Sequence, residues 1–309
     1  MAEEEAPPPP MMPPREESAF PSLPWAAGGV NELFDGVTPK TLFQAQVSVR
    51  DGLTSQGMGM MQGPAAFGQV GLQYASPLGN LKADLISQGV VNLSLDGFQP
   101  LPIMQLNTQL SFMSGMLVGG QLYSVLFTPV GVMTGGANLY GQLSGEFFTG
   151  IQPASYPGNQ VMLGVHTWGM PGIFGGYKAA IEWSREVVVN DELQAQCAVT
   201  AAVTKPYLMN DGEPGTHSFT LSAYHRMSES SLLAVQVEGG AQGSVMSTGR
   251  SRQLSEAQRL MARWTTQGIL GLALEQSGEK SVLSLCGEVD STPGRPLNPK
   301  FGVTLQMSA

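Results

Sequence analysis

Residues 41–51 read Thr-Leu-Phe-Gln-Ala-Gln-Val-Ser-Val-Arg-Asp, and this stretch decides the fold because apolar and polar side chains alternate along it. Successive side chains of a β-strand point to opposite faces, so a period of two predicts an amphipathic strand. One face carries Phe43, Ala45, Val47 and Val49, and the other carries Gln44, Gln46, Ser48 and Arg50.

The same alternation recurs along the rest of the chain, in residues 90–97, 105–112, 218–224, 233–238 and 300–307. Turn signals separate these runs. They are Asp51-Gly52, Pro77-Leu78-Gly79, Asp96-Gly97, Pro157-Gly158, Asp211-Gly212 and Ser277-Gly278. Strands of about 10 residues with turns of about 4 divide residues 41–309 into about 19 strands.

Composition favours a membrane barrel over a soluble β protein. Charged residues make up 13% of the chain, against roughly 25% in a typical soluble domain. No apolar run reaches the roughly 18 residues of a transmembrane helix, but a transmembrane strand needs only about 9–11 residues with half of them facing lipid. The polar faces are mainly Gln, Asn, Ser and Thr, which suits a wet lumen. Periodicity does not say which face is inside, so a soluble β-rich binding protein remains the alternative.

The chain divides into three parts. Residues 1–25 form a Pro-rich acidic leader with too little apolar content to pack, which predicts disorder. Residues 26–40 form a short helical or extended segment, with one helical turn at 31–34 that Asp35-Gly36 ends. Residues 41–309 form the barrel. Within them, residues 252–264 have helix-forming composition and an N-cap candidate in Ser255, and are either a loop helix or a charged barrel segment.

Charge and cysteine usage exclude several function classes. A formal net charge of −9 argues against a nucleic-acid partner and favours cationic ligands. Cys197 and Cys286 have no metal-binding or redox spacing, and the sequence leaves open whether they form a disulfide. The three histidines, His166, His217 and His225, have no metal-ligand spacing either. We therefore expect no enzyme activity, no metal and no cofactor.

Several segments resemble the channel-forming subunit of the mitochondrial outer-membrane protein-import translocase (TOM complex), in the mitochondrial porin superfamily. Phe34-Asp35-Gly36 resembles the family's Phe-Glu-Gly before its first strand, and residues 143–148 are similar to its central Leu-Gly-Gly-Glu segment. Other similar stretches are Leu81-Lys82-Ala83-Asp84, residues 284–290 and Pro299-Lys300-Phe301-Gly302-Val303. The family usually has a longer amphipathic helix inside the pore. The Pro-rich start and residues 252–264 have no clear counterpart.

The last strand also fits the mitochondrial β-signal, which the sorting and assembly machinery reads in that family. The signal is a polar residue, a glycine and two alternating hydrophobic residues, here Lys300, Gly302, Leu305 and Met307. The acidic N-terminus is unlike a basic transit peptide, and a β-signal would supply targeting without one. The signal is shared with voltage-dependent anion channels, so it supports the barrel class more than the subunit.

The resemblance implies a multi-pass protein of the mitochondrial outer membrane that passes unfolded precursor proteins with basic presequences. The implied partners are precursor proteins, membrane lipid, small single-helix translocase subunits and a presequence receptor, with a homodimer of barrels in a larger complex. A metabolite or ion porin of the voltage-dependent anion channel type is the rival function. Anion preference and indifference to presequence peptides would favour that rival.

Alternation places a set of acidic and amide side chains in the lumen. Passage of a basic peptide requires many weak contacts, because strong binding would trap it. The acidic candidates are Asp84, Asp96, Glu146, Glu238, Glu275, Glu288 and Asp290, against the bases Arg50, Lys82, Arg226 and Lys300, which leaves a net −3. The amide candidates are Gln44, Gln46, Gln105, Asn107 and Gln109. The expected effect is that of the summed field, in which any one carboxylate is expendable.

Overall fold

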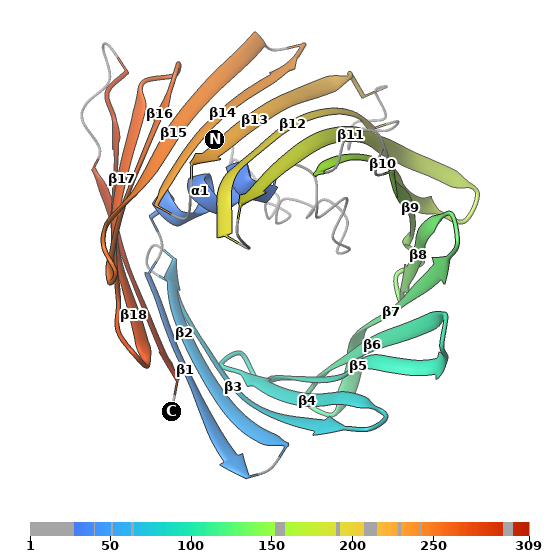
Figure 1. Ribbon diagram of the computed structural model, residues 1–309. Helices are drawn as coiled ribbons and strands as arrows, with labels where there is room; N and C mark the ends of the chain where they lie inside the picture. Colours follow the sequence, from blue (N-terminus) through green and yellow to red (C-terminus); the bar gives the residue numbers. More distant parts are fainter. Residues whose placement is uncertain are drawn as a thin grey trace, which may run out of the picture.

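The protein is a closed β-barrel of 19 strands with the helix α1 inside it (Figure 1). The computed structural model describes residues 28–39, 41–50, 52–62, 65–151, 158–189, 192–206, 215–227, 230–241, 243–292 and 299–308. The leader predicted for residues 1–25 lies outside this described part. A closed barrel whose outer face is apolar fits a membrane β-barrel protein, because in hydrocarbon every strand edge must be paired.

The helix and the strands follow one another in a simple order around the barrel. Their bounds are α1 Gly28–Val37, β1 Thr41–Arg50, β2 Leu53–Gln62, β3 Ala65–Ser76, β4 Gly79–Ile86, β5 Val90–Leu101, β6 Met104–Met113, β7 Met116–Thr128, β8 Gly131–Asn138, β9 Leu143–Ile151, β10 Asn159–Met170, β11 Ile173–Val189, β12 Glu192–Pro206, β13 Ser218–Met227, β14 Ser231–Gly240, β15 Gly243–Ser255, β16 Gln258–Thr265, β17 Ile269–Ser277, β18 Ser281–Asp290 and β19 Lys300–Ser308. The predicted count of about 19 strands is confirmed.

Closure joins the first strand to the last. Each strand pairs antiparallel with the next along the chain, while β1 and β19 pair in parallel, from Leu42 opposite Thr304 to Gln46 opposite Ser308. An odd number of strands that alternate in direction leaves the first and last strands pointing the same way. The parallel seam therefore follows from the strand count.

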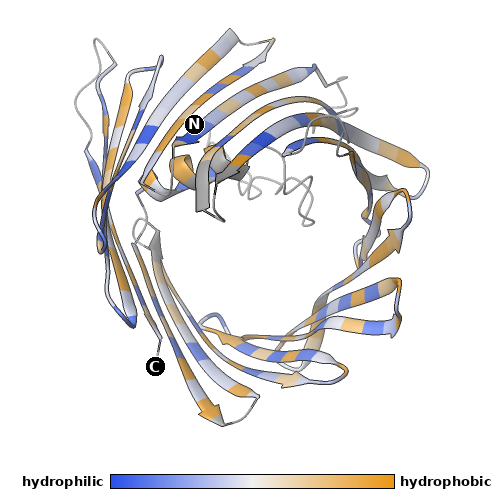
Figure 2. Ribbon diagram, viewed as in Figure 1, coloured by the Kyte–Doolittle hydropathy of each residue, from blue (hydrophilic) through white to orange (hydrophobic). Residues whose placement is uncertain are grey.

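Pairing also shows which face of each strand is inside. Residues directly opposite one another on neighbouring strands share a face, and α1 marks the inner one. Val165 on the outer face is 45% exposed, whereas the adjacent His166 on the inner face is 2% exposed. Figure 2 shows the resulting alternation of hydrophobic and hydrophilic residues along the strands. The predicted orientation holds for residues 43–49, where the apolar side chains point outward, whereas Leu42 points into the lumen with Gln44 and Gln46.

Residues 252–264 form the end of β15, a turn and most of β16, so the charged barrel segment is the correct alternative. The N-cap expected at Ser255 is wrong, because Ser255 is the last residue of β15. Leu260 and Trp264 alternate with Arg259 and Arg263 here, and pairing with β15 and β17 outweighs the weak helix propensity.

Two predicted boundaries, the end of a strand and the end of the helix, are also wrong. Asp96-Gly97 is a bulge inside β5, where Gly97 has a φ of 77° and its N–H donates a 2.6 Å hydrogen bond to Asn107 Oδ1. Asp-Gly suits a bulge as well as a turn, because both need a residue with positive φ. The helix continues past Gly36 to Val37 and begins at Gly28, so it is longer than one turn.

The orientation of the strands can be tested at the middle of β7, where Leu122 points outward and Gln121 points into the lumen. Leu122→Arg should lower the free energy of unfolding by about 2–4 kcal/mol, because it places a charge in the centre of the bilayer. Gln121→Arg should cost less than about 1 kcal/mol, since the lumen is wet. Urea titration of the protein refolded in lipid vesicles measures both. Equal losses would mean that the two faces have the same environment.

Candidate functional site

In the described part of the lumen, α1 packs against an apolar patch of the inner wall, which we call the seat of the helix. Val30, Leu33, Phe34 and Val37 of the helix are buried against inward side chains of four strands, β14 and β16–β18. These wall residues are Leu232, Ala234, Met261, Ala273 and Cys286, with Tyr224 of β13 packed at the edge. Figure 1 shows the helix lying against this part of the wall and not across the middle of the barrel. The described inner wall is thus apolar where the helix covers it.

Three glycines let the helix approach the wall closely. A Cβ at Gly249 on β15 would lie 2.6 Å from Leu33 Cδ2, and one at Gly271 on β17 would lie 2.5 Å from Val37 Cγ1. On the helix side, a Cβ at Gly36 would lie 2.9 Å from Met261 Sδ. The role predicted for Gly36, that of ending the helix, is therefore replaced by a packing role.

Polar contacts complete the seat. The guanidinium of Arg263 lies 5.6 Å from the centre of the Phe34 ring, within range of a cation–π interaction. At the end of the helix, the Thr38 hydroxyl donates a 2.9 Å hydrogen bond to the Phe34 carbonyl. The Cys286 thiol lies 3.7 Å from the carbonyl oxygen of Thr38. Both cysteines are free, which answers the question that the sequence left open.

Register places all twelve acidic and amide lumen candidates on the inner face. Examples are Gln44 and Gln46, which lie opposite Gln306 and Ser308 of β19, and Asp84, which lies opposite Asn92. The others are Asp96, Gln105, Asn107, Gln109, Glu146, Glu238, Glu275, Glu288 and Asp290. Of the predicted bases, Lys82, Arg226 and Lys300 also point inward, and the side chain of Arg50 lies outside the described part.

Five inward charges were not predicted. Glu182 and Glu186 lie on β11 with Lys178, and Arg259 and Arg263 lie on β16. The alternation of Ile181 and Trp183 with Glu182 and Ser184 was a usable signal for β11, whereas β16 was hidden in the unassigned segment. On the described inner wall, nine acidic side chains against six basic ones give a net −3.

Some of the acids are partly neutralised by neighbouring bases. Lys82 Nζ lies 3.3 Å from Asp96 Oδ2, and Glu288 lies 3.5 Å from Lys300 Nζ and 3.9 Å from Arg263. Asp84 instead accepts a 3.0 Å hydrogen bond from the Gln56 amide, and Glu182 accepts one of 2.6 Å from Thr200. These two hydrogen bonds fix the positions of the Asp84 and Glu182 carboxylates.

A row of three titratable side chains crosses the wall far from α1. Glu146 on β9, His166 on β10 and Lys178 on β11 lie directly opposite one another in the register. The His166 ring stacks on Trp168, with 5.5 Å between ring centres, and neither ring nitrogen has a hydrogen-bond partner among the described residues. No group of three or more His, Cys, Asp or Glu side chains in the described part could hold a metal ion.

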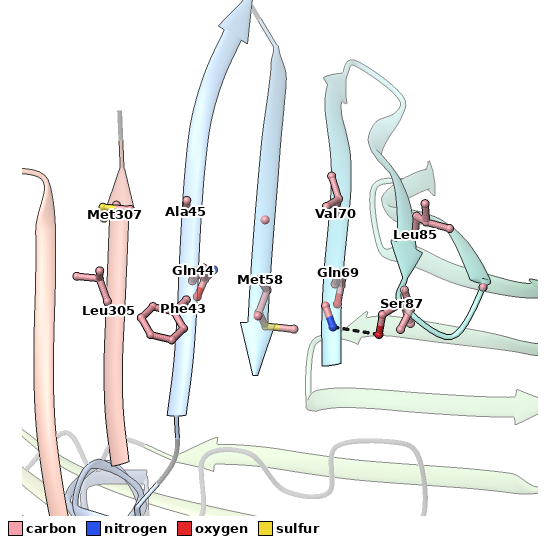
Figure 3. Close-up of a pocket in the computed structure, with 15 residues that line it drawn as sticks. Phe43, Gln44, Ala45, Met58, Gln69, Val70, Leu85, Ser87, Leu305 and Met307 are labelled. Carbon is pink, nitrogen blue, oxygen red and sulfur yellow. Dashed lines mark hydrogen bonds between the residues drawn. The ribbon is translucent and has the colours of Figure 1, made fainter. Parts of the chain in front are cut away.

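A separate hollow lies on the outer face, at the seam of the barrel (Figure 3). Glycines of β2 and β3 form its floor, and Phe43, Leu305, Val70 and Leu85 stand around it. The N–H of Gly68 donates a 3.1 Å hydrogen bond to Ser87 Oγ at its edge. This apolar hollow faces away from the lumen, so it is no part of the channel wall.

No family model matches the chain, and no curated protein matches it at a significant level. Among the described residues, no helix is both long enough and apolar enough to cross a bilayer.

The close approach of α1 to the wall at Gly271 allows the docking of the helix to be tested. Gly271→Val should push Val37 off the wall, since overpacking costs about 1–3 kcal/mol and shifts a docking equilibrium roughly 5- to 150-fold. With Cys197→Ala as the background, Cys286 beneath the helix end should then react at least about fivefold faster with a maleimide.

The matched control is Gly59→Val, because a Cβ at Gly59 would meet nothing within 4 Å. It should leave the labelling rate unchanged. If Gly271→Val also left the rate unchanged, the helix would not be what protects Cys286.

Proposed function

We propose that this protein is a protein-conducting channel that passes unfolded mitochondrial precursor proteins across the outer membrane. The observation that carries the proposal is a closed 19-strand barrel whose described inner wall bears nine acids against six bases. The width of the barrel, the distribution of its charge and the position of α1 each support it.

Width is the first support. Strands spaced roughly 4.8 Å apart and tilted by roughly 40° give 19 strands a backbone diameter of about 38 Å. Side chains on both sides reduce the free width to roughly 25 Å, while a helix with its side chains measures about 10–12 Å. A second helix or an extended polypeptide therefore fits beside α1, a far larger solute than a small metabolite requires.

The arrangement of charge is the second support. Inward acids stand on β4, β5, β9, β11, β14, β17 and β18, whereas the described residues of β6, β7 and β8 carry no charge. Carboxylates thus occur at separate points around and along the wall. A cationic peptide meets many weak sites instead of one strong one, which favours movement over trapping.

The position of α1 is the third support. The helix covers the apolar seat on β14–β18 and leaves the wall with Glu146 and Asp84 uncovered in the described structure. A solute in transit therefore meets mostly amide, hydroxyl and carboxylate groups. Such a surface offers an unfolded chain little apolar area on which to stick.

Location and partners follow from the resemblance and form part of the proposal. The protein would lie in the mitochondrial outer membrane, assembled through a β-signal in which Lys300 and Gly302 point inward while Leu305 and Met307 point outward. It would function as a homodimer of barrels with small single-helix subunits and a presequence receptor. Affinity purification in mild detergent should recover these subunits, and purification of the barrel alone would favour a metabolite porin.

Conductance measurements test the lumen directly. In planar bilayers under a salt gradient, the reversal potential should show cation preference. A basic amphipathic presequence peptide should block the current, less strongly at high salt because screening shortens the range of the field. Anion preference together with indifference to the peptide would contradict the proposal and favour the anion-channel type.

Charge variants test the summed field. Neutralising one acid, as in Asp84→Asn, should weaken peptide affinity by about 1.4- to 5-fold, because each exposed pair contributes only about 0.2–1 kcal/mol. A triple variant, Asp84→Asn with Glu146→Gln and Glu275→Gln, should weaken block by roughly tenfold and reduce cation preference. Lys178→Gln is the control of opposite sign and should increase cation preference. If one single substitution weakened block as much as the triple variant does, the result would point to one binding site.

A further inference from the structure

Among the strand side chains that the structure describes, the outward-pointing charges are all of one sign. The described acidic side chains of the strands point into the lumen, whereas Arg185, Lys205, Arg250 and Arg252 point outward with His225. The assignment follows from register, because Arg185 pairs with Cys197, and His225 and Arg250 both pair with Leu233. Although the protein has a net charge of −9, the described charged side chains that face the bilayer are all basic.

Four of these side chains lie near the same mouth of the barrel. Strands β11, β13 and β15 run in the same direction, and the four residues lie within the last six positions of their strands, which end at Val189, Met227 and Ser255. We call Arg185, His225, Arg250 and Arg252 the basic arc. Lys205, by contrast, lies next to the end of β12, at the opposite mouth.

The residues of the basic arc are close enough to act together. Arg185, His225 and Arg250 belong to one continuous row of paired residues across β11–β15, and Arg252 stands two positions along β15. Alternate strands lie roughly 10 Å apart, a gap that two long side chains can span. All four side chains are exposed, and within the described part none of the three arginines makes an ion pair or a side-chain hydrogen bond.

We propose that the basic arc binds the phosphate of an anionic phospholipid in the leaflet at this mouth. Strands β11 and β15 place these arginines at headgroup depth, where a guanidinium can donate to phosphate oxygens while its stem stays among acyl chains. Arginine is well suited to this role because its planar fork pairs with phosphate through two hydrogen bonds. The apolar neighbours Leu233 and Leu260 face the acyl region beside Arg250 and Arg252, which suits a lipid better than an acidic protein.

Native mass spectrometry of the full chain in mild detergent tests this proposal, with phosphatidylglycerol and phosphatidylcholine as probes. The wild type should retain phosphatidylglycerol more tightly, and increasingly so as salt is lowered. Each arginine near a lipid surface contributes an amount that corresponds to about a fivefold change in affinity. Arg250→Gln and Arg252→Gln should therefore each weaken phosphatidylglycerol binding about fivefold, and the double variant roughly 25-fold.

Lys205→Gln is the matched control, because it removes one outward charge at the other mouth and should leave binding at the arc unchanged. Arg250→Lys with Arg252→Lys keeps both charges and should retain most of the affinity, which separates loss of charge from loss of folding. Glycerol phosphate added in solution should not compete at the concentration of the lipid, since it lacks acyl chains.

Three results would overturn the proposal. One is equal retention of the two lipids by the wild type, and another is unchanged phosphatidylglycerol binding in the double Gln variant. The third is competition by glycerol phosphate as effective as that of the lipid, which would indicate a site for soluble phosphate. If lipid retention did not respond to the substitutions but capture of an acidic protein did, the surface would belong to a protein partner.

Discussion

The unpaired edge of a β-sheet is the constraint on which the rest of this structure depends. In hydrocarbon each unsatisfied backbone group costs several kcal/mol, so a lipid-facing sheet must close on itself. Here the parallel pairing of β1 with β19 closes it. The register at that seam also fixes the faces, because a slip by one residue would turn Gln44 and Gln46 toward lipid and Phe43 into the lumen. Closure and sidedness are thus settled by the same set of backbone hydrogen bonds.

The strands could be predicted because each one carries its own period of two, as residues 41–50 show most clearly. The failures occurred where a local signal has two structural meanings. Asp96-Gly97 satisfies a bulge as well as a turn, and only pairing with β6 decides between them. In β16 the alternation of Leu260 and Trp264 with Arg259 and Arg263 was present in the sequence. It left two alternatives open, a loop helix and a charged barrel segment, because the same residues also form helices readily.

The lumen could be predicted in part, for a different physical reason. An acid on an amphipathic strand is placed by that strand alone, so Glu238 or Glu275 needed no knowledge of its neighbours. The seat of α1 has no such local signal, since Ala234, Met261 and Cys286 each interrupt the polar pattern of a different strand. Their common role becomes visible only when α1, which is distant from them in the sequence, packs over them through Leu33 and Val37.

The wall of the barrel is a single β-sheet, so adjacent residues of a strand face opposite sides of it. The two faces can therefore carry charges of opposite sign, which the net charge of the chain does not reveal. On β11, Glu186 points into the lumen and the adjacent Arg185 points outward. An outward arginine would cost about 2–4 kcal/mol at the bilayer midplane but only about 0–1 kcal/mol near the interface. Arg250 and Arg252 are therefore tolerable because they lie near a strand end. The two faces can change independently, because neighbouring residues of one strand meet different solvents.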